Sequence, residues 1–268
     1  AQKRGGKGRA AMPIKDEDFI RQVFVLNTHD PVLFFTNTGI VYELKVYKLP
    51  LGNPQAKGRP IINLLPLSEG EKVTTMMPLP ENEDNPPDLM FATRSGNVRR
   101  NPLSDFSNVK ANGKIAMKLV EGDSLIGVVP CKKSDDIMLS ASLGKCMRFR
   151  SNDVRLFKGR GSIGVRGIRL KPEDHVISIS VLKHIQEDTD VKVLYLKAAS
   201  AQRRGETQDY IQEEKFDSMH INDQFILTIS ENGYGKRTSA YEYRITNRGG
   251  QGIINIETSE RNGPVIAS

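Results

Sequence analysis

Short apolar runs that end in a glycine turn recur along the chain and set its predicted secondary structure. Four runs share this form, each with four mostly apolar residues followed within five residues by a glycine. They begin at Leu33, Leu89, Ile137 and Phe225 and lead into Gly39, Gly96, Gly144 and Gly233. Glycine supplies the positive φ angles that tight hairpins need. Each run therefore predicts a strand that enters a hairpin.

A second frame recurs between these runs: a glycine with an apolar residue at position +4 and usually another at +6. Its glycines are Gly8, Gly58, Gly113, Gly164 and Gly252. Ten residues later, four of the five frames have an Asp or Asn, which closes a turn with its own side chain. Successive frames are 50, 55, 51 and 88 residues apart. Periods of about 40–50 residues with several short strands per unit are typical of propeller-like radial folds.

Polar and apolar residues alternate in segments such as 165–170 and 176–181, as expected for half-buried strands. The pattern predicts an all-β, propeller-like fold of four-stranded units in a single domain over residues 1–268. Four units are complete, from about residue 32 to residue 267. The first unit is represented only by its second half, and a final hairpin is missing. About five blades are therefore represented.

The 88-residue step contains a surplus that breaks the period, at about residues 183–222. This stretch is polar and contains a run of helix formers around Leu194 and Ala198. We expect a peripheral, partly helical insertion between two units. Its segment 202–205 echoes the opening of the chain, but Glu206 follows and a second glycine is absent. We interpret it as a solvated loop.

Composition narrows the class of protein. The 268 residues contain no apolar run long enough for a membrane span and no secretory segment, so we expect a soluble, cytoplasmic protein without a membrane partner. Cys131 and Cys146 lack a metal or redox spacing and are expected to be reduced, packed thiols. The formal net charge of +7 matters only if it is focused on one surface.

Motifs that suggest an enzyme lack the context that their chemistry requires. Residues 159–164 match a GxGxxG dinucleotide motif, but an alternating strand follows where a helix is needed. Residues 235–238 resemble part of a phosphate-binding loop but have Arg237 where Ser or Thr should stand. The four histidines show no metal spacing. We expect no catalytic residue, no metal and no cofactor in this domain.

Basic residues recur at matching places in the repeat. The opening loop interleaves four cations with glycines, which allow the backbone to approach phosphate oxygens. A radial repeat would bring the equivalent cations to one rim, whereas the alternative for any one of them is a solvated surface charge. The predicted phosphate-contacting residues are Gln2, Lys3, Arg4, Gly5, Gly6, Lys7, Gly8, Arg9, Lys57, Arg59, Arg99, Arg100, Lys145, Arg148, Lys158, Arg160, Arg166, Lys236, Arg237 and Arg248.

The opening run Gln2-Lys3-Arg4-Gly5-Gly6-Lys7-Gly8 resembles the seven-residue box of the C-terminal domain of the bacterial DNA gyrase A protein. The loops at 58–65, 164–170, 232–238 and 260–263 resemble that family in the same order. The resemblance implies a β-pinwheel, a propeller-like disc whose basic rim wraps double-stranded DNA. That family usually has six blades, so the chain looks like a fragment. The insertion lies outside the family pattern.

The resemblance also implies a role in a larger enzyme. This domain would bend and wrap duplex DNA without sequence specificity and so give gyrase its negative supercoiling. Its partners would be the N-terminal breakage-reunion domain of the same polypeptide and the gyrase B protein, in an A2B2 type IIA topoisomerase of the cytoplasm that associates with the nucleoid. The catalytic residues, ATP and Mg²⁺ would belong to other parts of that enzyme.

Two alternatives remain. The C-terminal domain of the topoisomerase IV A protein shares the pinwheel but has a degenerate box, and the intact box disfavours it. The second is a propeller-like scaffold whose basic rim binds an acidic protein. The chain has no Trp and only 6% aromatic residues, so it offers few platforms for stacking single-stranded bases. It also lacks a helix-turn-helix or zinc-finger pattern, which disfavours sequence-specific binding.

Overall fold

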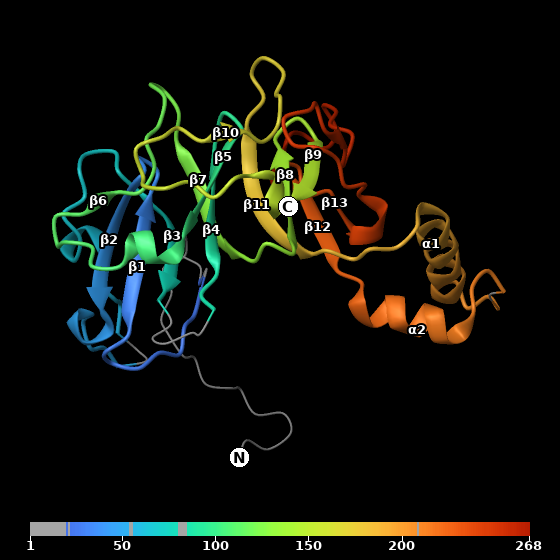
Figure 1. The fold of residues 1–268 in the computed structure, drawn as a ribbon, viewed down its shortest axis with the longest axis horizontal. Helices are drawn as coiled ribbons and strands as arrows, with labels where there is room; N and C mark the ends of the chain where they lie inside the picture. Colours follow the sequence, from blue (N-terminus) through green and yellow to red (C-terminus); the bar gives the residue numbers. More distant parts are fainter. Residues whose placement is uncertain (1–19, 21, 54–55, 80–84, 208) are drawn as a thin grey trace.

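The structure is a computed structural model that describes residues 20, 22–53, 56–79, 85–207 and 209–268. The described residues form four antiparallel sheets in succession, from β1 to β13 in Figure 1, and a pair of helices beside the last sheet. Figure 1 shows that the chain advances from sheet to sheet in one direction. The propeller-like prediction is therefore confirmed at the level of architecture.

Three sheets have four strands each, and the last has three strands among the described residues. Sheet 1 has the order β3 (Val73–Pro78), β1 (Pro31–Thr36), β2 (Ile40–Lys45), β6 (Lys114–Ile115). Sheet 2 has the order β10 (Val165–Arg166), β5 (Asn97–Pro102), β4 (Asp88–Thr93), β7 (Leu125–Cys131). Sheet 3 has the order β11 (Val176–Lys183), β8 (Asp135–Ala141), β9 (Lys145–Arg150), β14 (Ile253–Ile254). Sheet 4 has the order β13 (Gly235–Ser239), β12 (Phe225–Ser230), β15 (Val265–Ala267).

The outermost strand of each complete sheet comes from the following repeat. In sheet 2, β10 follows the third hairpin in sequence but pairs with the second, through Val98 and Val165. β6 joins β2 and β14 joins β9 in the same way. The sequence predicted four strands per repeat but not this exchange, because a period reveals how often a strand occurs and not which neighbour it joins. The exchange ties each sheet to the next.

Glycines at both sides of the exchanged strand make this close approach possible. Gly164 precedes β10 with φ +81°, and a Cβ there would collide with the carbonyl oxygen of Val98. On the accepting side, the carbonyl oxygen of Gly96 accepts hydrogen bonds from the N–H groups of Gly167 and Ile168. The hairpin glycine of one repeat and the frame glycine of the next therefore directly precede the two strands of the same contact, β5 and β10.

Apolar side chains from successive sheets form one core layer after another. Between sheets 1 and 2, Phe35, Phe91 and Phe106 pack with ring centroids 5.4–5.7 Å apart. Such ring pairs contribute about 0.5–1.5 kcal/mol each beyond their buried area. Ile137 and Leu139 of β8 continue the core toward sheet 2. Because both faces of an inner sheet are covered, most of its strand residues are buried.

The insertion folds as two helices, α1 (Thr189–Arg203) and α2 (Glu213–Asn222), as the sequence predicted in part. Tyr195, Phe216 and Met219 pack with Tyr241 and attach the pair to sheet 4. Segment 202–205 is exposed and forms the end of α1 and the turn after it. Short 3-10 helices complete the description: η1 (Val46–Lys48), η2 (Ile61–Asn63), η3 (Leu103–Phe106), η4 (Ser151–Asp153) and η5 (Ala240–Glu242).

Candidate nucleic-acid interface

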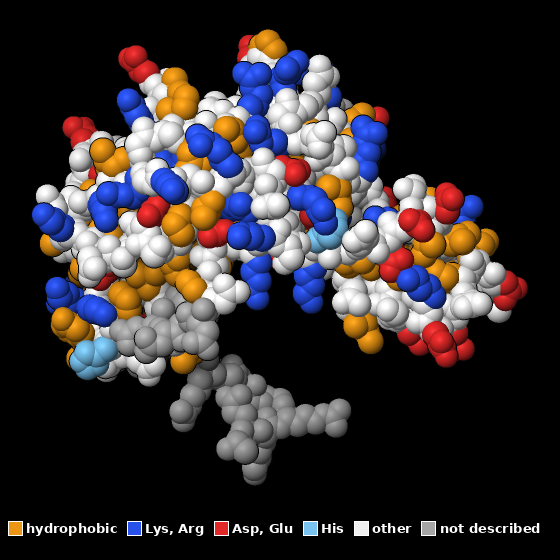
Figure 2. All heavy atoms as spheres, viewed as in Figure 1, with side chains coloured by type: hydrophobic (Ala, Val, Ile, Leu, Met, Phe, Trp, Pro, Cys, Tyr) orange, Lys and Arg blue, Asp and Glu red, His pale blue; other side chains and the backbone are white. Residues whose placement is uncertain are grey.

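Charge is divided between the sheets and the helical pair. Residues 184–223 contain nine Asp and Glu against five Lys and Arg, a net charge of −4, so the rest of the chain carries +11 to give the total of +7. Figure 2 shows Lys and Arg side chains spread over the sheet body, several at its upper margin, and acidic side chains gathered on the lobe of α1 and α2. A polyanion would approach the sheets rather than the lobe.

Most of the predicted phosphate-contacting residues that the structure describes reach the surface. The exposed ones are Lys57, Arg59, Lys158, Arg166, Lys236 and Arg237, and the half-buried ones are Lys145, Arg160 and Arg248. Arg237 is exposed on the face of sheet 4 that no further sheet covers among the described residues, and its guanidinium lies 4.1 Å from the centroid of the Phe225 ring. The predicted residues Gln2 to Arg9 lie outside the described residues.

Three predicted contacts are wrong, because the structure buries Arg99, Arg100 and Arg148. They lie on the inner strands β5 and β9, whose faces are covered by neighbouring sheets and loops. The sequence placed them by their distance from a hairpin glycine, and this distance does not distinguish the edge of a sheet from its interior. These side chains support the fold and do not reach the surface.

Arg148 is the centre of a buried polar network where sheets 3 and 4 meet. Its guanidinium lies 2.8 Å from Asp136 Oδ2 and donates to the carbonyl oxygen of Ala240 at 2.6 Å. His184 Nδ1 lies 3.0 Å from the other oxygen of Asp136. Arg150 Nη2 lies 2.7 Å from His184 Nε2, which must accept this bond, so Nδ1 carries the proton and donates to Asp136.

Arg100 occupies the same repeat position one sheet earlier, four residues after the hairpin glycine. Its Nε lies 3.8 Å from Asp88, and its Nε and Nη1 have no hydrogen-bond partner among the described residues. Burial is the main cause that raises the pKa of Asp88, while the charge of Arg100 opposes the rise. The pair is therefore looser than the pair of Arg148 and Asp136.

Arg99 is fully buried and bonded to oxygens from three segments. Its Nε donates to Asn101 Oδ1 at 2.6 Å and its Nη2 to the carbonyl oxygen of Ala116 at 2.7 Å. Its Nη1 donates to the carbonyl oxygens of Arg160 at 2.7 Å and Ser162 at 2.8 Å. Burial lowers the pKa of Arg99 to about 10, so the side chain remains charged at neutral pH. It lies directly beneath the loop that carries Lys158 and Arg160.

Two half-buried arginines make equivalent bonds between neighbouring exchanged strands. Arg160, four residues before Gly164, donates to the carbonyl oxygen of Ile115 at 3.0 Å. Arg248, four residues before Gly252, donates to the carbonyl oxygen of Arg166 at 3.1 Å. Ile115 and Arg166 are themselves equivalent, each two residues after its frame glycine. The repeat thus brings these loops into the same register along the sheets, each with an arginine at its surface.

Further exposed cations were not among the residues predicted from the sequence. Lys118 and Arg169 each follow a frame glycine by five residues and are exposed. The apolar residues at +4 and +6 point inward, so alternation directs the side chain at +5 outward, and this signal could have identified both. Arg155 is also exposed, with its guanidinium 4.1 Å from the centroid of the Phe157 ring.

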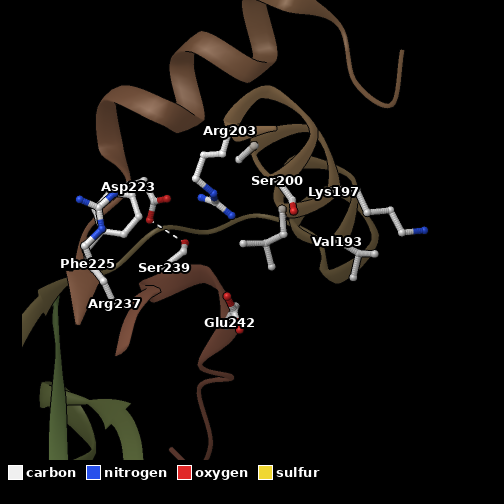
Figure 3. Close-up of a pocket in the computed structure, with 11 residues that line it drawn as sticks. Val193, Lys197, Ser200, Arg203, Asp223, Phe225, Arg237, Ser239 and Glu242 are labelled. Carbon is white, nitrogen blue, oxygen red and sulfur yellow. Dashed lines mark hydrogen bonds between the residues drawn. The ribbon is translucent and has the colours of Figure 1, made fainter. Parts of the chain in front are cut away.

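A cleft of about 490 Å³ separates α1 from sheet 4 (Figure 3). Arg203 points into it from α1, and Asp223 lies at its sheet side. Asp223 accepts hydrogen bonds from Ser239 Oγ at 2.7 Å and Tyr195 Oη at 3.0 Å, so its carboxylate is already engaged. Within the described part of the chain, no three His, Cys, Asp or Glu side chains are placed to hold a metal ion. Likewise, no described helix combines the length and apolar character of a membrane span.

Comparison with known proteins gives a consistent result. The family model of the DNA gyrase C-terminal domain, a β-propeller, matches residues 1–27, 30–80, 87–132, 135–183 and 224–267, and so omits most of the insertion. The DNA gyrase A protein of Rickettsia bellii is 49% identical over 99% of this chain, and that of Escherichia coli K12 is 40% identical over 100% of this chain. The chain spans only 31% and 26% of these relatives, respectively.

Solved structures agree on the fold. The C-terminal domain of DNA topoisomerase IV aligns over 94% of this chain and 67% of its own, with a TM-score of 0.71 and 19% identity. The C-terminal domain of DNA gyrase A aligns over 90% of this chain and 65% of its own, with a TM-score of 0.62 and 24% identity. At such identities the likeness establishes the architecture alone.

Proposed function

The chain belongs to the DNA gyrase C-terminal domain family, and on that premise we propose that it binds and bends double-stranded DNA without sequence specificity. The observation that carries the proposal is the register of exposed and half-buried cations on the loops and strands that pass from one sheet to the next. Lys158 and Arg160 precede the exchanged strand β10, which contains Arg166, and Arg248 lies before β14 at the place equivalent to Arg160.

The physics of such binding is electrostatic. Smooth bending of a 20–30 bp site by 40–90° costs on the order of 1–6 kcal/mol. Phosphate contacts offset that cost, and each one steepens the fall of log Kobs with log salt concentration by about 0.9. The proposed contacts are Lys57, Arg59, Arg155, Lys158, Arg160, Arg166, Lys118, Arg169, Lys145, Lys236, Arg237 and Arg248, together with the loop Gln2 to Arg9.

In the whole protein, this binding would wrap a DNA segment and present it for strand passage, giving negative supercoiling. The partners would be the breakage-reunion domain of the same polypeptide and the gyrase B protein, in the cytoplasm. Catalysis, with ATP and Mg²⁺, would take place in those other parts. The relatives whose names support this role are DNA gyrase A proteins.

A mobility-shift titration of this chain with random-sequence duplex across a salt series tests the proposal. We expect retardation that tolerates any sequence and weakens steeply with salt. Absence of binding, with capture of an acidic protein instead, would favour an interaction scaffold. Religation of nicked circles with the chain bound then measures the handedness of the bend. In the assembled enzyme, alanine at Lys3, Arg4 and Lys7 should abolish supercoiling and spare relaxation.

A further inference from the structure

The loop at 157–164 is built differently from its neighbours. It carries the GxGxxG pattern, which is not a dinucleotide-binding motif here because a strand follows it where a helix would be needed. That strand is β10, the exchanged strand of sheet 2. Residues 157–164 themselves form no helix or strand, and β10 begins directly after them at Val165. Contacts with other segments must therefore hold the loop in its conformation.

Two side chains of β5 hold the carbonyl groups of this loop inward. Arg99 Nη1 bonds the carbonyl oxygens of Arg160 and Ser162, at 2.7 and 2.8 Å. Asn101 Nδ2 bonds those of Phe157 and Gly159, at 3.1 and 2.8 Å. Residues two apart on a strand point to the same face, so β5 presents both groups together. Arg99 and Asn101 together donate hydrogen bonds to four carbonyl oxygens within six residues of the loop.

The amide groups of the loop are consequently left free. None of the N–H groups of residues 158–162 donates a hydrogen bond within the described part of the chain. Lys158, Gly159 and Gly161 are exposed, and Arg160 and Ser162 are half-buried. Successive backbone N–H groups turned to one side form a concavity that attracts anions, and glycines allow close approach to it.

The charged side chains beneath and beside the loop are positive, as a site for an anion requires. Arg99 has no carboxylate within ion-pair distance among the described residues, and the carboxylate whose charge influences it, that of Asp105, accepts a hydrogen bond from Asn101 Nδ2. Lys158 and Arg160 add two cations at the surface. Three positive charges thus surround free amides, and a bound anion would relieve their mutual repulsion.

We propose that residues 158–162 form a seat for one backbone phosphate of duplex DNA, with Arg99 and Asn101 as its positioning residues. The seat rests on the proposed DNA-binding function. Arg99 acts without touching DNA: its bonds turn the loop carbonyls inward and so present the amides to a phosphate oxygen.

The neighbouring repeats are built without this device. The residue at the place of Arg99, three positions after the hairpin glycine, is Tyr42 in sheet 1 and Met147 in sheet 3. In the equivalent loop at 246–251, where every residue is described, no side chain of β9 bonds a backbone carbonyl. That loop supplies an internal control within the same chain.

Amide hydrogen exchange of the wild-type chain, free and bound to random-sequence duplex, tests the seat without any substitution. We expect DNA to protect the amides of residues 158–162 and to protect those of the equivalent residues 246–250 less. Equal exchange at residues 158–162 with and without DNA, while the duplex is bound, would overturn the seat and leave the proposed function standing. A wild-type chain that binds no duplex would overturn both.

Substitutions then separate positioning from mere support of the fold. Arg99→Met should reduce the salt slope of duplex binding by about 0.9, equivalent to one phosphate contact, although the side chain is buried. Arg100→Met, also buried and adjacent on the same strand, is the matched control and should leave the slope unchanged. Arg99→Lys, which keeps the charge but not the fork of donors, should recover only part of the loss. If Arg99→Met does not fold, the exchange measurement decides; if it folds with the wild-type slope, the positioning role is wrong.

Discussion

Both the sheet body and the helical insertion bury apolar side chains, yet only the body repeats its contacts at equivalent positions of successive units. In the body, Arg100 and Arg148 occupy one repeat position and Arg160 and Arg248 another, and each pair makes related contacts. The insertion has a single cluster around Tyr195 and Phe216, without an equivalent elsewhere in the described part of the chain. A repeat can distribute one kind of contact along a surface, whereas a single insertion cannot.

The charges of the two regions follow the same division. The insertion carries −4 and the rest of the chain +11, although both expose many polar residues. An acidic lobe beside a basic surface limits where a polyanion can lie, since like charges repel within about 10 Å at 0.1 M salt. The comparison therefore predicts that the body folds and binds by itself and that the insertion modulates it.

The largest expected effect lies inside the body, where sheets 3 and 4 meet. Arg148→Met would leave Asp136 buried with only the Nδ1–H group of His184 as a side-chain partner, and would leave the carbonyl oxygens of Ala240 and Lys183 without this donor. Loss of one member of a buried ion pair costs about 3–5 kcal/mol. We expect a loss of that size in the free energy of unfolding, measured by urea denaturation.

Arg100→Met is the matched control for this prediction. Because two of the nitrogens of Arg100 have no hydrogen-bond partner among the described residues, its removal should cost no more than about 1–2 kcal/mol. Equal losses from the two substitutions would show that repeat position, and not the quality of the pair, sets the stability of the interface.

A smaller effect should separate the stability of the insertion from that of the body. Met219→Ala removes a buried side chain of the cluster that attaches α2 to α1 and Tyr241. Such truncations cost about 2–5 kcal/mol, and a small peripheral cluster that can collapse lies near the lower end. Amide exchange should accelerate in both helices and remain unchanged in β8 and β12. Faster exchange in those strands would show that the two regions open as one unit.

The sequence predicted the repeating features of the fold and missed those that depend on which neighbour a strand joins. Alternation and glycine spacing located the hairpins, and helix formers located part of the insertion. The exchange of β10 into sheet 2 was not visible, because the contact between Val98 and Val165 spans a whole repeat. This pairing makes β5 an inner strand of sheet 2. Because the sequence did not reveal the pairing, it predicted Arg99 of β5 as a surface cation.

The candidate site shows the same limit. Lys158 and Arg166 lie on loops or edge strands, where a cation remains exposed whatever the pairing, and both are exposed as predicted. The role of Asn101 had no signal in the sequence, since its acceptors lie 56 and 58 residues away in the chain. Composition and period identify the cations, but only the sheet topology separates those that face solvent from those that hold the loops.

Removal of the insertion tests the division of charge directly. Lys183 N–H donates to Gln224 Oε1 at 2.6 Å, so the two ends lie close enough for a short Gly/Ser linker to replace residues 184–223. Loss of a net charge of −4 should raise duplex affinity a few-fold at low salt, and the gain should fade as salt screens the lobe. The fall of log Kobs with log salt should therefore become slightly steeper when the insertion is removed.

A fall in affinity on removal would contradict this prediction and would assign DNA contacts to the insertion itself. The cations at issue would then be Lys197 and Arg203, which line the cleft beside α1. Alanine at both positions in the complete chain is the corresponding control, and we expect wild-type binding from that variant.

The smallest effect concerns the alkylation rate of thiols, which can be measured separately in the body and in the insertion. Cys131 and Cys146 are buried in the body, and burial raises the pKa of each thiol to about 12. Both therefore stay protonated in the folded chain at about pH 8 and should resist alkylation, because the thiolate is the reactive form. A cysteine introduced by Ser218→Cys, at an exposed position of α2, should react rapidly under the same conditions.

The same two thiols give the sign of a pH dependence. The folded state holds their protons more tightly than the unfolded state, so their contribution to stability is complete below about pH 9 and is lost as the pH rises toward 12. Alkylation of the native cysteines should therefore follow global unfolding, whereas labelling of Ser218→Cys should not. If the native cysteines reacted as fast as the cysteine of Ser218→Cys, the body would expose its thiols without global unfolding, and this prediction would be wrong.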